Sequence, residues 1–316
     1  MLSTNELAGS RKILALRPPK NVVDPARPYA FLVEPERTRT GTVEDTAVVF
    51  LTNRECPFRC LMCDLWKNTT DHRVRDGAIV QQVAYALVRL ARASHIKLYN
   101  AGNFFDAQAI PPADWPRIAE LLHSFQTVIV ESHPRLIGPR SLAFREMLRP
   151  ELQVAIGLET VHPEVLPRLN KLMTLADVEA AVRFLTAHNI AIRAFILLRP
   201  PFLSESEGVH WAKESLRFAF DVGVECCVVI PTRAGNGAMD ELQRRGEFTP
   251  PRLESLEEVL DFGIRLNRGR VFADMWDVEK LAPCASCGPE RAARLHGMNL
   301  TQRPAPPVGC SCGSGR

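Results

Sequence analysis

The chain of 316 residues contains no long apolar run. A membrane-spanning helix needs about 18 or more apolar residues in succession, and no stretch of the sequence approaches that length. The first residues, MLSTNELAGSRKILALRPPK, also lack the apolar segment and the small-residue cleavage site of a signal peptide. These absences predict a protein without a membrane anchor that works in the cytoplasm.

A strong charge of either sign is missing as well. Lysine and arginine number 39 against 36 aspartates and glutamates, which gives a net charge of +3. Such a small excess neither establishes nor excludes a nucleic-acid partner. No internal repeat is visible, and a hydrophobic content of 46% is ample for a packed core.

Cysteine is too sparse for a disulfide scaffold of this size, because the whole chain has nine. Seven of the nine nevertheless fall in two tight clusters. In a reducing compartment, clustered cysteines point to metal ligation rather than to disulfides. The two clusters are Cys56, Cys60 and Cys63, and Cys284, Cys287, Cys310 and Cys312.

Short apolar, β-branched runs alternate with longer segments whose apolar residues recur at helical spacing. This alternation predicts an α/β protein with a parallel sheet, either an open doubly wound sheet or a partial (β/α)6 barrel. Thr174, with Asp177 three positions later, has the pattern of a helix cap. The predicted strands are 46–52, 95–100, 127–132, 152–159, 190–198 and 224–230.

Three regions follow from this pattern. Residues 1–45 are rich in arginine and proline and predict an irregular lead-in, and residues 46–235 form the β/α core. Residues 236–316 hold a further helix over 251–266 and a small cysteine-rich extension clipped by a metal. In either candidate fold, ligands bind at the carboxyl ends of the parallel strands.

The first cysteine cluster follows the first predicted strand with the spacing Cys56-x3-Cys60-x2-Cys63. A structural zinc site takes four protein ligands, so three cysteines leave it incomplete. A [4Fe-4S] cluster takes one ligand per iron, and three cysteines leave one iron open for a substrate or cofactor. The alternatives are a zinc site completed by a distant residue such as His72, or a cluster used only for electron transfer.

A CxxxCxxC motif after the first strand of a six-fold β/α pattern resembles the signature of the radical S-adenosylmethionine (SAM) enzymes. This resemblance implies a partial (β/α)6 radical SAM barrel, with SAM chelated to the open iron of the cluster. In that family, reductive cleavage of SAM yields a 5'-deoxyadenosyl radical that abstracts a hydrogen atom from the substrate. Met62 stands where family members usually carry an aromatic residue.

The same resemblance suggests which residues meet SAM, although it identifies no catalytic residue. The segment after the second strand stands where the family binds the SAM ammonium, and the third and fourth strands end in carboxylates. Arg193 interrupts an apolar strand, so it either neutralises the SAM carboxylate or forms a structural ion pair. Asn170 and Lys171 are further candidates for the same charge. The predicted cofactor-binding residues are Asn100, Gly102, Asn103, Glu131, Ser132, Gly157, Glu159 and Arg193.

The C-terminal cluster offers four cysteines as CxxC and CxC, separated by 22 residues. Four thiolates close a tetrahedral site, which predicts a structural zinc ion. An auxiliary iron-sulfur cluster and free cysteines are the alternatives.

Several segments together resemble the radical SAM partners of archaeosine synthase, and more broadly the elongator catalytic subunit. They include CLMCDLW, AGNFFD, ESHPR and RPPFLSE. The resemblance implies a carbon-nitrogen lyase acting on a 7-deazaguanine base in tRNA. It also implies a lysine-transferase partner and an electron donor such as ferredoxin or flavodoxin. The alternative function is a cluster- and zinc-bearing electron-transfer or nucleic-acid-binding protein without SAM catalysis.

Overall fold

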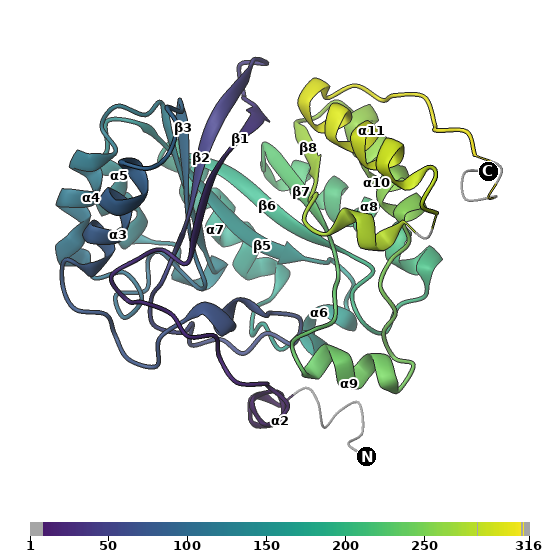
Figure 1. Cartoon of the computed structure of the whole chain (residues 1–316), viewed down its shortest axis with the longest axis horizontal. Helices are drawn as coiled ribbons and strands as arrows, with labels where there is room; N and C mark the ends of the chain where they lie inside the picture. Colours follow the sequence, from purple (N-terminus) through teal and green to yellow (C-terminus); the bar gives the residue numbers. More distant parts are fainter. Residues whose placement is uncertain (1–8, 283, 311, 313–316) are drawn as a thin grey trace.

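The computed structural model describes residues 9–282, 284–310 and 312 (Figure 1). Its centre is one eight-stranded sheet in which the strands follow one another in chain order. Strands β2 to β8 are parallel, and β1 pairs antiparallel with β2 at one edge. The sheet curls into an open half-barrel. The strands are β1 (Ala30–Arg37), β2 (Val43–Leu51), β3 (His95–Asn100), β4 (Thr127–Ser132), β5 (Glu151–Glu159), β6 (Ala191–Leu198), β7 (Cys226–Pro231) and β8 (Arg270–Ala273).

The six predicted strands are confirmed as β2 to β7, and the partial barrel is the form that they take. The prediction of an irregular lead-in was wrong for β1. Its sequence AFLVEPER carries a proline and three charges, and most of its residues are only half-buried. An edge strand tolerates both features, because one side of its backbone needs no partner. The short strand β8 also escaped prediction.

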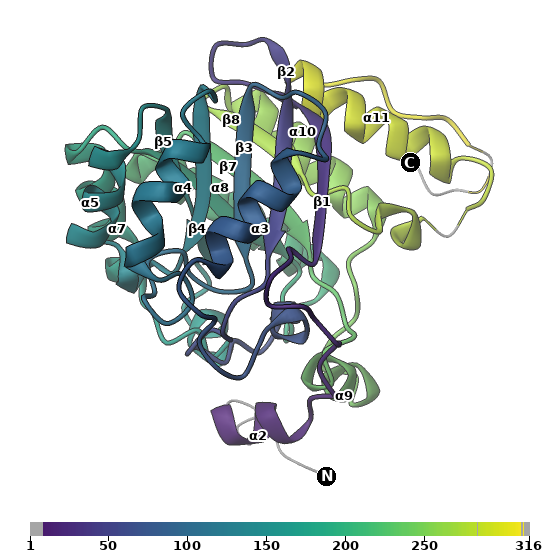
Figure 2. The ribbon, with the colours of Figure 1, turned by 60° about the vertical axis from the view of Figure 1, so that its left-hand side comes forward.

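Helices cover the convex face of the sheet, and Figure 2 shows α3 and α4 lying across the strands. Buried side chains such as Val49, Leu98 and Val154 form the core between the sheet and these helices. Thr174 and Asp177 make the predicted reciprocal cap. The helices are α2 (Ser10–Ala15), α3 (Ala78–Leu87), α4 (Trp115–Leu121), α5 (Pro139–Met147), α6 (Val165–Arg168), α7 (Leu175–Ala187), α8 (Glu205–Val222), α9 (Ala238–Arg244), α10 (Leu253–Leu266) and α11 (Gly288–Thr301), with 3-10 turns η1 (Leu65–Asn68), η2 (Pro112–Asp114), η3 (Pro134–Leu136) and η4 (Val278–Leu281).

The C-terminal extension is part of the barrel and not a separate appendage. Strand β8 continues the sheet beyond β7, and α11 packs against both β8 and β1 (Figure 1). The guanidinium of Arg270 donates to the carbonyl of Arg37 at 2.8 Å, which links the two edge strands directly. The gap between the sheet edges is therefore bridged by the extension.

The concave face carries polar and aromatic side chains. Tyr99 lies between Phe50 and Phe195, with ring centroids 6.1 and 6.2 Å away. All three rings are only half-buried. In the part of the chain that the structure describes, no helix has the length and apolar character needed to cross a membrane.

Candidate cofactor site and metal centre

The loop with Cys56, Cys60 and Cys63 follows β2 at the carboxyl end of the barrel. Two neighbouring loops hold its backbone. The amide of Leu61 donates to Leu169 O at 2.8 Å, and the Asn170 side chain donates to Arg59 O at 2.7 Å. From the loop after β7, the Asn236 side chain donates to Leu61 O and Cys63 O at 2.8 and 3.0 Å. The segments after β5 and β7 thus fix the conformation of this cysteine loop.

The N-terminal segment braces the same loop from outside. Glu55 accepts ion pairs from Arg17 and Lys20 at 2.7 and 2.8 Å. Burial alone would raise the pKa of Glu55, but the hydrogen bonds from Lys20 and Arg17 keep it below its usual value. Ile13 of α2 and Leu61 of the loop share a small apolar cluster with α9. Part of the region predicted as a lead-in therefore supports the site.

The segment after β3 approaches the first cysteine closely. A side chain at Gly102 would bring its Cβ within 3.2 Å of Cys56 Cβ, so the cysteine would have to shift to make room for it. The amide nitrogen of Asn103 lies 3.1 Å from Cys56 Sγ, close enough to donate a hydrogen bond. The Asn103 oxygen accepts from the backbone amide of His133 at 2.5 Å. Asn103 therefore joins the cysteine loop to the end of β4.

His133 and Phe58 are site residues that the sequence reasoning did not select. Their rings stack with centroids 3.8 Å apart and planes 8° from parallel. Burial, and after it the charge of Lys171, lowers the pKa of His133 to about 4, so the ring is neutral at pH 7. The position of His133 directly after a strand, in the segment ESHPR, is the signal that could have found it.

Glu159 and Lys171 form a buried ion pair beside the cysteine loop. Burial would lower the pKa of Lys171, but Glu159, and after it the Cys60 thiol, raise it above its usual value. The pair occupies the space that a side chain at Gly157 would need. Glu159 follows a register shift in β5 and has a φ of 65°. The local backbone is therefore shaped to accommodate this pair.

Glu131 ends β4 inside the barrel and accepts a hydrogen bond from the Asn100 backbone amide at 2.8 Å. Desolvation raises the pKa of Glu131 to about 8, although the Asn100 hydrogen bond and the Lys171 charge oppose the rise. The side chain of Asn100 is fully buried, and neither polar atom has a partner among the described residues. Ser132 is buried beside His133. The buried Asn100 amide can therefore still donate and accept hydrogen bonds, and a bound cofactor could supply the partners.

The three thiols of the cysteine loop lie in a desolvated setting. Burial raises the pKa of Cys60 to about 12, and it also raises that of Cys63, where the nearby Cys60 and Cys56 contribute. Among the described residues, these sulfurs do not form a group within 4.8 Å of one another, as the C-terminal ones do.

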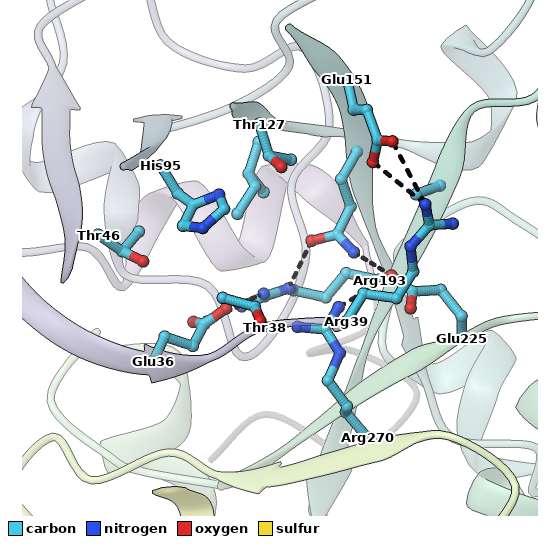
Figure 3. Close-up of a pocket in the computed structure, with 13 residues that line it drawn as sticks. Glu36, Thr38, Arg39, Thr46, His95, Thr127, Glu151, Arg193, Glu225 and Arg270 are labelled. Carbon is cyan, nitrogen blue, oxygen red and sulfur yellow. Dashed lines mark hydrogen bonds and ion pairs between the residues drawn. The ribbon is translucent and has the colours of Figure 1, made fainter. Parts of the chain in front are cut away.

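Arg193 forms the structural ion pair that was the alternative to a role at the SAM carboxylate. It lies at the amino-terminal end of the barrel, where its guanidinium contacts Glu36 at 2.5 Å and Gln153 at 3.2 Å (Figure 3). Lys97 also pairs with Glu36, at 2.5 Å. The strand that carries Glu36 was not predicted, so its pairing with Arg193 could not be foreseen. We therefore leave Arg193 out of the cofactor site.

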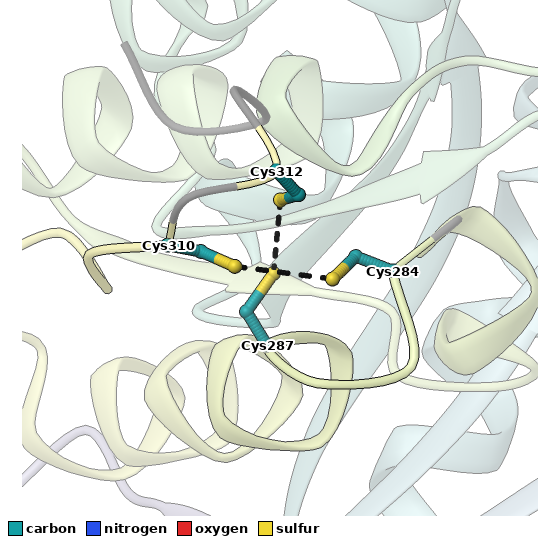
Figure 4. A group of neighbouring side chains, drawn as sticks. All are labelled: Cys284, Cys287, Cys310 and Cys312. Atoms are coloured by element: carbon teal, nitrogen blue, oxygen red, sulfur yellow. Dashed lines mark hydrogen bonds between the residues drawn. The ribbon is translucent and has the colours of Figure 1, made fainter.

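The C-terminal cysteines converge on one point. The sulfurs of Cys284, Cys287, Cys310 and Cys312 all lie within 4.8 Å of one another (Figure 4). Cys284 and Cys310 are 3.9 Å apart, and Cys287 and Cys312 are 3.8 Å apart. Zinc-sulfur bonds of about 2.3 Å in a tetrahedron place neighbouring sulfurs about 3.8 Å apart. The spacing therefore fits a single tetrahedral ion.

Comparison with known proteins gives sequence relatives but no matching family model. An uncharacterized protein of Methanocaldococcus jannaschii is 23% identical over 257 residues, which cover 76% of this chain and 70% of that protein. Archaeosine synthase subunit beta of Thermococcus kodakarensis is 28% identical over 64% of this chain, and that of Methanosarcina acetivorans is 25% identical over 66%. The matches span 65% and 64% of those two subunits, just under two thirds of their length.

Solved structures with the same fold include a radical SAM methyltransferase from Sphaerobacter thermophilus, with a TM-score of 0.53 and 15% identity. That match covers 78% of this chain and 76% of the other. Methylornithine synthase matches with a TM-score of 0.50 and 13% identity, over 86% of this chain and 72% of that enzyme. The chain therefore has the fold of these two enzymes, one of them a radical SAM methyltransferase, and its sequence is similar to archaeosine synthase subunit beta.

Proposed function

We propose that the protein is a radical SAM enzyme whose [4Fe-4S] cluster is held by Cys56, Cys60 and Cys63. The proposal depends on the hydrogen bonds that hold the cysteine loop in place. Asn170 and Asn236 bond to its backbone, and the Asn103 side-chain nitrogen lies 3.1 Å from Cys56 Sγ. Three soft ligands leave one iron open, and Asn100 supplies a buried amide without a partner among the described residues. The residues present therefore fit both the cluster and a polar cofactor bound beside it.

When bound, the cluster and SAM would supply the one-electron chemistry that removes a hydrogen atom from a substrate. The chain's own residues orient and shield that chemistry. Lys171 places a positive charge near the cysteines, where the SAM carboxylate would be bound. The Glu159 carboxylate pairs with the Lys171 ammonium and holds it in place. Glu131, whose pKa is raised to about 8, keeps a proton at neutral pH and can donate it in a hydrogen bond inside the barrel. Gly102, Ser132 and Gly157 complete the proposed pocket.

The proposed substrate is a modified 7-deazaguanine base in tRNA, and the proposed reaction is cleavage of a lysine side-chain carbon-nitrogen bond. Two relatives named archaeosine synthase subunit beta support this choice. It implies a lysine transferase that prepares the adduct and an electron donor such as ferredoxin or flavodoxin. A cytoplasmic location suits a tRNA substrate.

We further propose that Cys284, Cys287, Cys310 and Cys312 bind structural zinc. The sulfur spacings of 3.8 and 3.9 Å support zinc over an auxiliary cluster, since a cluster would spread its ligands wider. Cys284 and Cys287 precede and begin α11, and Cys310 and Cys312 follow it. A metal at this point would tie the end of the chain to the helix that bridges the sheet edges.

SAM cleavage tests the main proposal. Anaerobically reconstituted protein should hold about four irons at the first cluster and release 5'-deoxyadenosine when SAM and a reductant are added. Cys60→Ala should abolish this release, whereas Cys227→Ala, a buried cysteine outside both clusters, should retain it. Full activity of Cys60→Ala would refute the ligand assignment. Bound iron without SAM cleavage would favour the electron-transfer alternative.

A further inference from the structure

Trp276 is the tryptophan that the fold leaves exposed. The chain has four tryptophans, and 64% of the surface of Trp276 is accessible. Trp66 and Trp115 are buried, and Trp211 is partly covered, with its ring centroid 4.5 Å from that of His162. Because tryptophan is the largest apolar side chain and is mostly covered in folded proteins, this exposure needs an explanation.

The loop that presents Trp276 is well fixed. The guanidinium of Arg233 donates to the Trp276 carbonyl and, at 2.7 Å, to the Asp274 carboxylate. The Trp276 amide donates to the same carboxylate at 3.2 Å. Val278, two residues later, is buried in the core. The indole is therefore held outward by an ordered backbone, which lowers the entropy cost of binding a ligand.

This loop lies on the same side of the barrel as the cysteine loop. Strands β7 and β8 run parallel, and Trp276 and Arg233 follow their carboxyl ends. Asn236 stands three residues after Arg233 and grips the backbone carbonyls of Leu61 and Cys63. Three residues span at most about 11 Å, so Arg233 lies close to the loop that holds the proposed cluster.

We propose that Trp276, with Arg233 beside it, is a stacking platform for a nucleobase of an RNA substrate. The proposal rests on the proposed function, in which the target base is part of a tRNA. Enzymes that act on a base extrude it from its stack and contact the flanking nucleotides. An exposed aromatic ring can stack on any base, and Arg233 holds the Trp276 loop in place through its bonds to Asp274 and the Trp276 carbonyl. At the rim of the barrel, Trp276 would stack on the base that flanks the target base, while the target base itself enters the barrel.

Binding of a tRNA transcript at fixed ionic strength tests the platform. Trp276→Ala should raise the Kd roughly 5- to 100-fold, which corresponds to the loss of one stacked base. Trp276→Phe keeps a stacking ring and should retain most of the affinity. Met147→Ala serves as the matched control, because Met147 is 44% exposed at the end of α5, next to the amino-terminal start of β5. Iron content and melting temperature check that each variant is folded.

The outcomes separate the platform from the proposed function. If wild type binds the transcript and Trp276→Ala binds it equally well, the platform is wrong and the tRNA substrate stands. If wild type cleaves SAM but binds no transcript, both the platform and the tRNA substrate fail, while the radical SAM assignment survives. Loss of self-association in Trp276→Ala, with RNA binding intact, would make Trp276 a protein contact and would also overturn the proposal.

Discussion

The side-chain amide of Asn299 makes two hydrogen bonds to the backbone of Ala273. Its oxygen accepts from the Ala273 amide at 2.9 Å, and its nitrogen donates to the Ala273 carbonyl at 2.8 Å. Gln302 makes the same pair of bonds to Val271, each 2.8 Å long. The two amides thus act as a substitute strand along the free edge of β8. A sheet edge that would otherwise present unpaired groups is covered by α11.

Asn299→Ala should therefore lower the free energy of unfolding by about 1–3 kcal/mol, because it leaves two buried backbone groups without partners. Urea denaturation followed by circular dichroism measures the change. Gln243→Ala, at an exposed position of α9, should stay within about 0.5 kcal/mol of wild type. An equally small effect of Asn299→Ala would contradict the edge-covering role.

Gly157→Ala should reduce SAM binding and SAM cleavage, because a methyl group at this position meets the Glu159 and Lys171 side chains. Overpacking of this kind typically costs about 1–3 kcal/mol. Gly297→Ala is the matched control, since the space around Gly297 in α11 is open. There alanine should leave activity unchanged and raise helix stability by up to about 1 kcal/mol. Calorimetric titration of SAM into both variants makes the comparison, and unaltered SAM affinity in Gly157→Ala would count against the proposed pocket.

Lys171→Ala should destabilise the protein by about 3–5 kcal/mol, because it leaves the Glu159 carboxylate buried without its partner. The double variant Lys171→Met with Glu159→Gln should recover much of this loss by removing both charges. Equilibrium unfolding of the wild type, Lys171→Ala and the double variant measures how much of the lost stability the double variant recovers. Equal losses in the single and double variants would show that the pair is not the source of the stability.

Because the pKa of Glu131 is raised, we expect the free energy of unfolding to fall as the pH rises from about 4.5 to about 8. Its pKa is raised by burial to about 8, so in this window the unfolded chain has lost the proton and the folded chain still holds it. Stability then decreases with pH, since the unfolded state binds fewer protons. The expected contribution is ~2 kcal/mol, allowing for partial solvent access. Glu131→Gln should flatten this part of the profile, and an unchanged slope would contradict the assignment.

Removal of the zinc proposed for the C-terminal cysteines should loosen α11 and should leave the proposed iron site at Cys56, Cys60 and Cys63 occupied. Treatment with a chelator should release about one zinc per chain and lower the Tm by several degrees. Cys287→Ser should lose that zinc but retain iron, whereas Cys60→Ala should retain zinc and lose iron. Metal analysis of the two variants measures the zinc and the iron that each one retains. Loss of zinc from Cys60→Ala would show that the two cysteine groups do not act separately.

Local pattern alone was enough to predict the repeating unit of this protein and to single out its two groups of clustered cysteines. Each strand from β2 to β7 is a short apolar run between helical segments, and such runs can be recognised within a few residues. The three cysteines lie within one loop, and their number predicts a [4Fe-4S] cluster with one open iron, because a structural zinc ion takes four protein ligands. The C-terminal cysteines were likewise visible as a set of four.

Only the tertiary structure decided which distant residues become neighbours. Glu36, Arg193 and Lys97 come from three strands, and their pairing depends on β1, whose mixed sequence carries no clear strand pattern. Stacking of His133 on Phe58, and the contact of Trp276 with Arg233, likewise depend on how the strands bring their following loops together. Sequence records what each segment can form alone, whereas burial and charge pairing are properties of segments packed together.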